Sequence, residues 1–460
     1  MSFDRNLAEI RFGCGLSPEI SAPGSVAHIL DRLQAPDRAA IAYPIAAFAN
    51  VFGQTQKLWE LKQIKRKNKG STRARLVDEE IVELRKSARR EQQVWFCQQM
   101  QRRISTNDGL RERLNFFWAD HFTARGKSGL LNRANAAYVE SSIRPYLTGK
   151  FRVLLKAAVT SPLMLLYLDQ TASAGPNSDR AKKRPNAGLN ENLARELLEL
   201  HTLGVAGPYK QADVRELAKL LAGLHVKPSG VSAFRGSYAE PGSKTVLDLT
   251  YGSRRPEMAD IDQVLTDLAR HPATARHIAT KLARHFVSDQ PAAGLIEQMT
   301  ARFLETDGHL IAVYESMLTH PEAWSEQSPN IKQPIDFVGS ALRALLPPSQ
   351  PRHKNRQFRI SRHMFVPLAL MGQTWEAPEG PDGWPEDDAA WLTPQGLATR
   401  LQWAMSVPQL LCTDLPDPRD FVHSALGKRA PRAVHFAAHA AESRAEGIGL
   451  VLASPAFQRL

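Results

Sequence analysis

The chain has 460 residues, a formal net charge of +12 at pH 7 and 43% apolar residues, enough for a substantial core. Its three cysteines, Cys14, Cys97 and Cys412, are far apart and lack metal-ligand spacing, which argues against a disulfide scaffold and for reduced thiols. No apolar run fits a signal peptide or a membrane span, so we expect a cytoplasmic protein without membrane association.

The N-terminal part is predicted to be helical, with one strongly basic interruption. Apolar spacing and dense Glu/Arg pairs predict helices at residues 26–33, 76–104, 109–124, 135–147 and 151–168. Asn107 and Asp108 supply an N-cap for the helix at 109–124. Segment 62–75 has seven Lys or Arg residues and no acidic residue, which predicts an exposed basic loop that attracts an anionic partner.

The rest of the chain is also predicted to be mainly helical. The helical patterns lie at residues 190–204, 211–224, 260–271, 273–287, 292–305, 309–319, 334–346, 394–405, 417–427 and 431–445. Alternating residues between glycines predict a small β-hairpin insertion near 230–252. We expect a second exposed basic loop at 349–363 and an ordered Pro/Gly/Trp loop at 374–391. The expected fold class is mainly α, with one large helical domain over residues 1–460.

The helix near 190–204 divides its side chains into a polar and an apolar face. The polar face consists of Asn192, Arg195, Glu196 and Glu199. Two carboxylates on adjacent turns fit a hard divalent cation, or an acid and a base if their environments differ. Arg195 precedes Glu199 by four residues, so the same pattern also fits a solvated ion-pair face.

His121 is the second candidate, because it follows Asp120 in a strongly aromatic stretch. A histidine beside aromatic residues is often a hydrogen-bonded core residue. If His121 faces the helix near 190–204, it adds an imidazole to Glu196 and Glu199, and this mixed set would suit Zn, Fe or Mn.

Several motifs resemble one known family over nearly the whole chain. They lie at residues 110–122, 190–204, 271–282, 331–334, 372–391 and 452–459. On these motifs the chain resembles the bacterial domain of unknown function 1800 family, which carries no established reaction. Lys332 matches a family position and is expected to orient a carboxylate. The family pattern usually has a histidine where this chain has Ala239. If that histidine completes a metal site in the relatives, this chain has lost a ligand or belongs to a variant subgroup, and Glu240 is the residue that could substitute.

The resemblance also implies a partner, since these proteins are often encoded beside a family that resembles phosphatases and sulfatases. In the motif at 372–391, Gln373 and Trp384 are expected to form a substrate-binding wall, because tryptophans offer stacking surfaces as well as packing anchors.

Two main hypotheses and a weaker third follow. The first is a hydrolase-type enzyme with Glu196, Glu199, His121, Asn192 and Arg195 at its centre and a divalent metal on Glu196, Glu199 and His121. The second is an accessory protein whose basic loops dock an acidic partner, such as the phosphatase- or sulfatase-like protein. The third, nucleic-acid or anionic-polymer binding, depends on charge alone. The sequence has no nucleophile elbow, His-Glu-x-x-His, P-loop or dinucleotide fingerprint.

Overall fold

A computed structural model describes residues 3–184, 186–325, 329–346, 361–412 and 414–460. Its N-terminal part contains helices α1 (Arg5–Leu7), α2 (Val26–Gln34), α3 (Arg38–Ala42), α4 (Phe48–Lys67), α5 (Thr72–Ser105), α6 (Gly109–His121), α7 (Asn135–Ser142), α8 (Phe151–Val159), α9 (Pro162–Tyr167), α10 (Asp179–Lys183), α11 (Asn192–Glu196) and α12 (Gln211–Leu221).

Four short strands follow: β1 (Leu224–Val226), β2 (Ser232–Phe234), β3 (Lys244–Val246) and β4 (Leu249–Tyr251). The remaining helices are α13 (Met258–Arg270), α14 (Pro272–Phe286), α15 (Ala293–Glu305), α16 (Leu310–Thr319), α17 (Pro334–Leu345), α19 (Val366–Leu370), α20 (Asp388–Trp391), α21 (Pro394–Ser406), α22 (Pro408–Leu411), α23 (Pro418–Leu426), α24 (Arg432–Ala440), α25 (Arg444–Ala453) and α26 (Pro455–Gln458).

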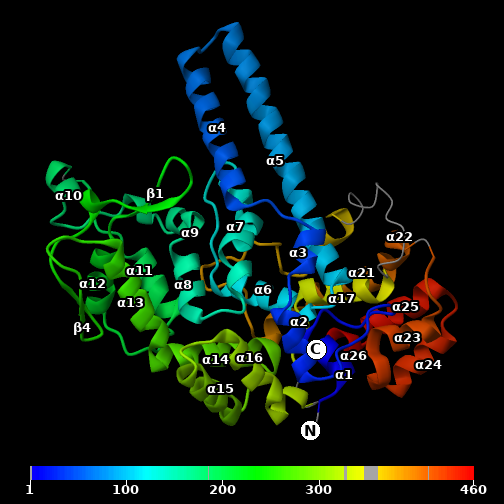
Figure 1. Cartoon of the computed structure of the whole chain (residues 1–460). Coiled ribbons are helices and arrows are strands. Elements are labelled where there is room, and N and C mark those ends of the chain that lie inside the picture. The colour runs from blue at the N-terminus through cyan, green and yellow to red at the C-terminus, as the bar shows by residue number, and fades with distance from the viewer. Residues whose placement is uncertain (1–2, 185, 326–328, 347–360, 413) are drawn as a thin grey trace.

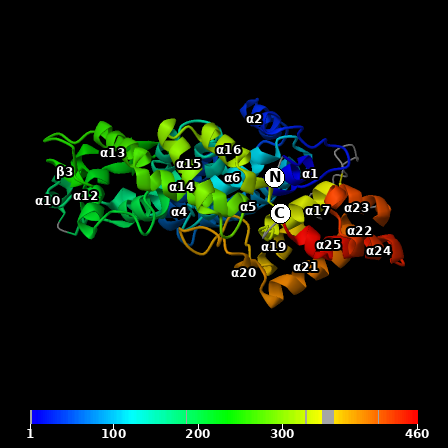
Figure 2. The ribbon, with the colours of Figure 1, turned by 90° about the horizontal axis from the view of Figure 1, so that it is seen from below.

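The mainly α fold class is confirmed, because the strands form only two small antiparallel pairs in the described part of the chain. β1 pairs with β2, and β3 pairs with β4, so the structure has two hairpins over residues 224–251 where one was predicted near 230–252. The body is elongated, with α10 to α13 at one end and α22 to α24 at the other (Figure 2). Helices α5, α6, α14 and α17 lie between these ends (Figures 1 and 2).

Capping groups and proline explain where the predicted helices begin and end. Asp108 caps α6 by accepting the amide hydrogen of Arg111, as its place before the helix suggested. The single helix predicted over 151–168 is two helices, because Pro162 begins α9 and disfavours helical backbone at Ser161. Ser161 caps the second helix through its side chain.

Helices α4 and α5 form a hairpin whose outer part projects from the body, which we call the arm (Figure 1). The arm has an apolar cluster of its own that includes Leu58, Leu61 and Ile81. Segment 62–75, expected to be a loop, is the tip of this arm: α4 continues to Lys67 and α5 begins at Thr72. The second basic segment, 349–363, lies largely outside the described residues.

One continuous apolar core joins the rest of the molecule, from Leu7 in α1 to Phe457 in α26. Its centre is aromatic: Trp118 of α6 is fully buried, and its indole N–H donates to the hydroxyl of Tyr314 in α16 at 2.7 Å. The segment from α19 to α20 runs back from the C-terminal helices across the central ones (Figure 2). This crossing brings residues 373–384 against α5 and α6.

Candidate functional site

The helix predicted near 190–204 is α11 followed by a π-helical segment, Leu197–His201. Asn192 is exposed, and Glu196 and Glu199 are half-buried. The Arg195 guanidinium lies 3.1 Å from a Glu199 carboxylate oxygen and 3.7 Å from one of Glu191. This polar face is therefore an ion-pair ladder along the helix, with Glu196 beside it.

Glu196 is the residue of this polar face whose pKa is shifted. Burial raises its pKa to about 7, and the negative charges of Glu199 and Asp382 contribute. Asp382 belongs to the Pro/Gly/Trp segment, so that segment lies near α11 as well as α6. Glu196 thus lies near this segment but does not line the cavity described below.

His121 lies in the core rather than on a ligand-binding face. Its ring Nε2 is 3.3 Å from the backbone oxygen of His201, and the ring Nδ1 of His201 is 3.1 Å from the backbone oxygen of His121. Burial lowers the pKa of His121 well below its usual value and lowers that of His201 to about 3, so both rings are neutral. These contacts fasten the end of α6 to the π-helical segment.

The structure does not bring Glu196, Glu199 and His121 together as a ligand set. Among the described residues, no group of three or more His, Cys, Asp or Glu side chains is arranged to hold a metal ion. Lys332 is buried elsewhere, with its ammonium 3.8 Å from the centre of the Phe457 ring, and burial lowers its pKa to about 7. Lys332 therefore does not share a face with the α11 carboxylates.

A different set of residues encloses a cavity of about 70 Å³ between α5, α6, α7, α17 and the segment 373–384. Its walls include the rings of Phe116, Trp375 and Trp384 and the polar side chains of Asn115, Asp120 and Glu376. A hollow that combines aromatic walls with a few polar groups is the usual form of a small-molecule site.

Asp120, in the last turn of α6, accepts the backbone N–H of Trp384 with both carboxyl oxygens, at 2.9 and 3.1 Å. Burial raises the pKa of Asp120 to about 8, Lys281 opposes this rise, and Glu386 and Asp382 add to it. Gly383 makes the close approach possible. Its φ is +85°, and a Cβ there would lie 2.4 Å from the Asp120 carboxylate.

Glu376 has a left-handed backbone conformation, with φ of +52°. Non-glycine residues adopt it at a cost of roughly 1–2 kcal/mol, so the surrounding contacts must hold it in place. The Gln99 side-chain amide donates to the Glu376 carboxyl at 2.7 Å, and the Trp375 indole donates to Gln99 at 2.8 Å. Burial raises the pKa of Glu376 to about 8, against the opposing hydrogen bonds from Gln99 and the Ala136 backbone.

Gln373 and Trp384, predicted to bind substrate, both line the cavity. The Gln373 amide is already engaged, because its oxygen accepts the Ile335 N–H at 2.8 Å and its nitrogen donates to Gln333 at 2.7 Å. Gln373 therefore fastens the segment to the start of α17, whereas the Trp384 side chain forms part of the wall.

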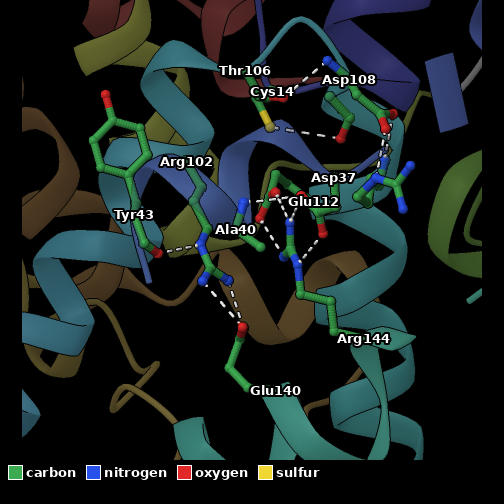
Figure 3. Close-up of polar contacts among 12 residues, drawn as sticks. Cys14, Asp37, Ala40, Tyr43, Arg102, Thr106, Asp108, Glu112, Glu140 and Arg144 are labelled. Carbon is green, nitrogen blue, oxygen red and sulfur yellow. Dashed lines mark hydrogen bonds and ion pairs between the residues drawn. The ribbon is translucent and has the colours of Figure 1, made fainter. Parts of the chain in front are cut away.

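A layer of buried ion pairs supports the helices around the cavity (Figure 3). Arg144 holds Glu112, a residue of the cavity wall, at 2.5 Å, and Asp37 at 2.6 Å. Arg102 of α5 pairs with Glu140 of α7 at 2.5 Å, and also donates to the backbone oxygen of Tyr43. These pairs fix α5, α6 and α7 relative to one another.

Asp120, Glu376 and Asn115 were not selected from the sequence as site residues. Asp120 directly precedes His121 in the aromatic stretch, and the sequence alone does not favour the aspartate over the histidine. Glu376 stands between Trp375 and Pro378 without a periodic pattern, and its cavity partner Gln99 is 277 positions earlier. Only the fold brings these groups together.

The fold and the site define a mainly α-helical protein with an aromatic-walled cavity that carries two perturbed carboxyl groups. The chain belongs to the family described as "Protein of unknown function (DUF1800)", whose model matches residues 9–459, and this confirms the resemblance seen in the motifs. No curated protein and no solved structure matches the chain. None of the helices in the described ranges is both long and apolar enough to cross a membrane.

Proposed function

We propose that this protein is a hydrolase-type enzyme that acts on a small molecule in the cavity, with Asp120 and Glu376 as its acid–base groups. The observation that carries the proposal is that two half-buried carboxyl groups with pKa values near 8 line one aromatic-walled cavity. A pKa near the working pH is what general acid–base catalysis requires, because both protonation states are then accessible.

In this mechanism one carboxyl group, still protonated, donates a proton to the leaving group. The other, ionised, accepts a proton from an attacking water molecule. Trp375 and Trp384 supply stacking faces for the substrate, and Asn115 offers a carboxamide to orient it. Glu196, with its pKa near 7, is an additional acid–base candidate near Asp382 of the segment.

The metal set predicted on Glu196, Glu199 and His121 remains a proposal without geometric support. The two glutamates come from successive turns of one helix, and His121 is held in the core by its backbone contacts. The catalytic roles we propose therefore belong to the cavity carboxyl groups.

The test is untargeted substrate profiling, in which purified protein is incubated with a bacterial metabolite extract and consumption is followed by mass spectrometry. We expect the wild type to consume at least one compound. Asp120→Asn and Glu376→Gln should consume it at least about 100-fold more slowly, because this is the usual contribution of a general acid or base. Glu379→Gln, an exposed carboxylate on the same segment, is the matched control and should behave as wild type.

Two results would contradict the proposal. One is equal consumption by the wild type and the two cavity variants. The other is no consumption by the wild type of any compound, which would favour a binding protein over an enzyme.

The arm supports a second candidate function, the docking of an acidic partner. Seven exposed Lys and Arg residues lie at its tip, with no acidic residue in segment 62–75. Of these, Lys65 pairs with Asp78 at 2.5 Å, which leaves most of the positive charge facing solvent. An acidic surface of a phosphatase- or sulfatase-like protein is the partner we propose.

Charge reversal tests this docking. We expect glutamate at positions Lys62, Arg66, Lys67 and Lys69 to weaken binding to that partner at least about tenfold and to reduce its salt dependence. Glutamate at four exposed basic residues elsewhere, Lys182, Lys183, Arg254 and Arg255, is the control with equal charge change. If both variants lose binding equally, the loss comes from net charge alone, as it would for non-specific nucleic-acid binding, and docking at the arm is contradicted.

A further inference from the structure

Among the described residues, the two carboxyl groups of the cavity have no counter-ion, unlike the Arg103 and Glu112 side chains of its wall. Arg103 pairs with Asp336 at 2.6 Å, and Glu112 pairs with Arg144 at 2.5 Å. Within the described ranges, neither Asp120 nor Glu376 has a Lys, Arg or His nitrogen at ion-pair distance. The cavity thus presents two acids whose neutralising partner does not come from the surrounding wall.

The hydrogen-bonding groups of the wall show the same bias. The Trp375 indole and one N–H of each of the Gln99 and Gln373 amides donate to other protein groups. By contrast, the buried Asn115 side-chain oxygen has no hydrogen-bond partner among the described residues, although the side chain lines the cavity. A buried acceptor without a donor is costly, so this oxygen is suited to an N–H group of a ligand.

The aromatic walls fit the same kind of ligand. Phe116, Trp375 and Trp384 border the cavity, and the faces of such rings attract cations through their quadrupole. The fold already uses this contact on one of them, because the Arg103 guanidinium lies 5.5 Å from the centre of the Phe116 ring.

We infer that the cavity binds the protonated amine of a small molecule, with Asp120 and Glu376 as its counter-ions, Asn115 as an acceptor and the indole rings as its walls. This substrate class rests on the proposed function, since it specifies what enters the same site. An ammonium carries three N–H donors and no acceptor, which suits the unpartnered Asn115 oxygen and two carboxyl groups that have no ion-pair partner among the described residues.

Binding of such a cation draws the proton from a cavity carboxyl group. The charges that face the two groups are Lys281 from α14 and Asp382 and Glu386 beside Asp120, and Glu140 from α7 near Glu376. Arg103 and Glu112 face the cavity already paired. Because a carboxyl group of pKa near 8 is about 3% ionised at about pH 6.5 and about 90% ionised at about pH 9, affinity for an amine should rise roughly 30-fold over this range.

The probe pair is cyclopentylamine and cyclopentanol, which share a ring and differ in the charged group. An alkylammonium of pKa about 10.4 stays protonated over this range, so any pH dependence comes from the protein. In calorimetric titrations we expect millimolar or tighter binding of the amine at the higher pH, with a roughly 30-fold loss at the lower pH. Cyclopentanol should bind more weakly and without pH dependence.

Variants locate the effect. Glu376→Gln and Asp120→Asn should each weaken amine binding at least about tenfold while leaving cyclopentanol binding unchanged, and Glu379→Gln should bind as the wild type does. Retained cyclopentanol binding shows that a variant is folded. Equal affinity for amine and alcohol, or no amine binding near 50 mM, would overturn the inference.

The two proposals can fail separately. Substrate consumption that depends on Asp120 and Glu376, without an amine preference, would keep the enzyme and remove the substrate class. An amine preference without any consumption would keep the cation site and remove the acid–base enzyme.

Discussion

Glu376 and Asp120 are held at the cavity by different backbone conformations. Glu376 itself adopts the strained backbone, with φ of +52°, whereas Asp120 sits on a regular helix and relies on the conformation of Gly383. Strain at a titratable side chain is a feature of functional sites, because the remainder of the structure must supply the stability to maintain it. Glu376 is therefore expected to reduce stability in exchange for a defined position.

The first prediction concerns pH and stability at Glu376. Its folded pKa, about 8, lies above the ordinary value of 4.5, so the folded state binds more protons between these two values. Stability must then fall as the pH rises from about 4.5 to about 8 and level off above this. We expect Glu376→Gln, which cannot ionise, to unfold at a higher denaturant concentration than wild type near pH 9 and at a similar one near pH 4.5. Parallel pH profiles of the two proteins would contradict the raised pKa.

The second prediction separates backbone strain from displacement of Asp120. Gly383→Ala should destabilise the protein by about 1–3 kcal/mol and also slow turnover, because the new Cβ meets the Asp120 carboxylate at 2.4 Å. Gly372 has φ of +96°, and a Cβ there would have no heavy atom within 4 Å. Gly372→Ala should therefore lower the free energy of unfolding through backbone strain but leave turnover unchanged. Turnover lost equally in both variants would show that Asp120 is not the affected group.

At the residue scale, the sequence predicted the neighbourhood of the site better than its chemistry. Gln373 and Trp384 were expected near a substrate and do line the cavity, since a Pro/Gly/Trp segment that carries tryptophans has to pack against something. The carboxylates chosen from the sequence lie on a helix with an evident polar face. The pKa of Glu376 depends on burial by residues far away in the chain, which no local pattern encodes.

At the scale of elements, the arm is the feature with the clearest structural independence. Its apolar cluster is separate from the main core and is made mostly of α4 and α5 residues with Leu130. A hairpin with its own small core can open locally while the body stays folded.

A substitution inside this cluster tests that independence. Ile81→Ala removes a buried side chain at a typical cost of about 2–5 kcal/mol, and we expect faster amide hydrogen exchange in the outer parts of α4 and α5 with no change in α6. The exposed neighbour Val82→Ala should leave exchange in the arm nearly unchanged. Faster exchange in α6 as well would mean that the arm and the body open as one unit.

The helices could be predicted from the sequence where periodicity and caps agreed, as in α5, α6 and α14. The arm could not, because charged residues occupy much of α4 near its end and obscure the apolar spacing of Leu58 and Leu61. The two hairpins between α12 and α13 have strands of only three residues, too short for alternation to separate them.

At the scale of the whole molecule, Asp336 connects three helices. Located on α17, it pairs with Arg103 of α5 at 2.6 Å and with Arg113 of α6 at 2.8 Å, and all three side chains are buried. These pairs pull the pKa of Asp336 below its usual value despite its burial. Asp336 thereby fixes α17 to α5, which contacts Glu376 through Gln99, and to α6, which contains Asp120.

Removal of Asp336 should consequently affect the entire fold. We expect Asp336→Ala to lower the free energy of unfolding by about 3–5 kcal/mol, because two buried arginines lose their counter-ion. Asp387→Ala breaks an exposed pair with Arg284 and should cost under about 1 kcal/mol. If denaturant titrations give the two variants a similar loss in the free energy of unfolding, the buried ion pairs of Asp336 do not stabilise the whole fold.

The protonation of the cavity carboxyl groups is the most direct test of the proposed site. Carbodiimides react with protonated carboxylic acids, and mass spectrometry of the labelled protein reads each position separately. We expect Asp120 and Glu376 to label at neutral pH and to lose reactivity with midpoints near pH 8. Midpoints near pH 4 for both cavity residues would contradict the acid–base site.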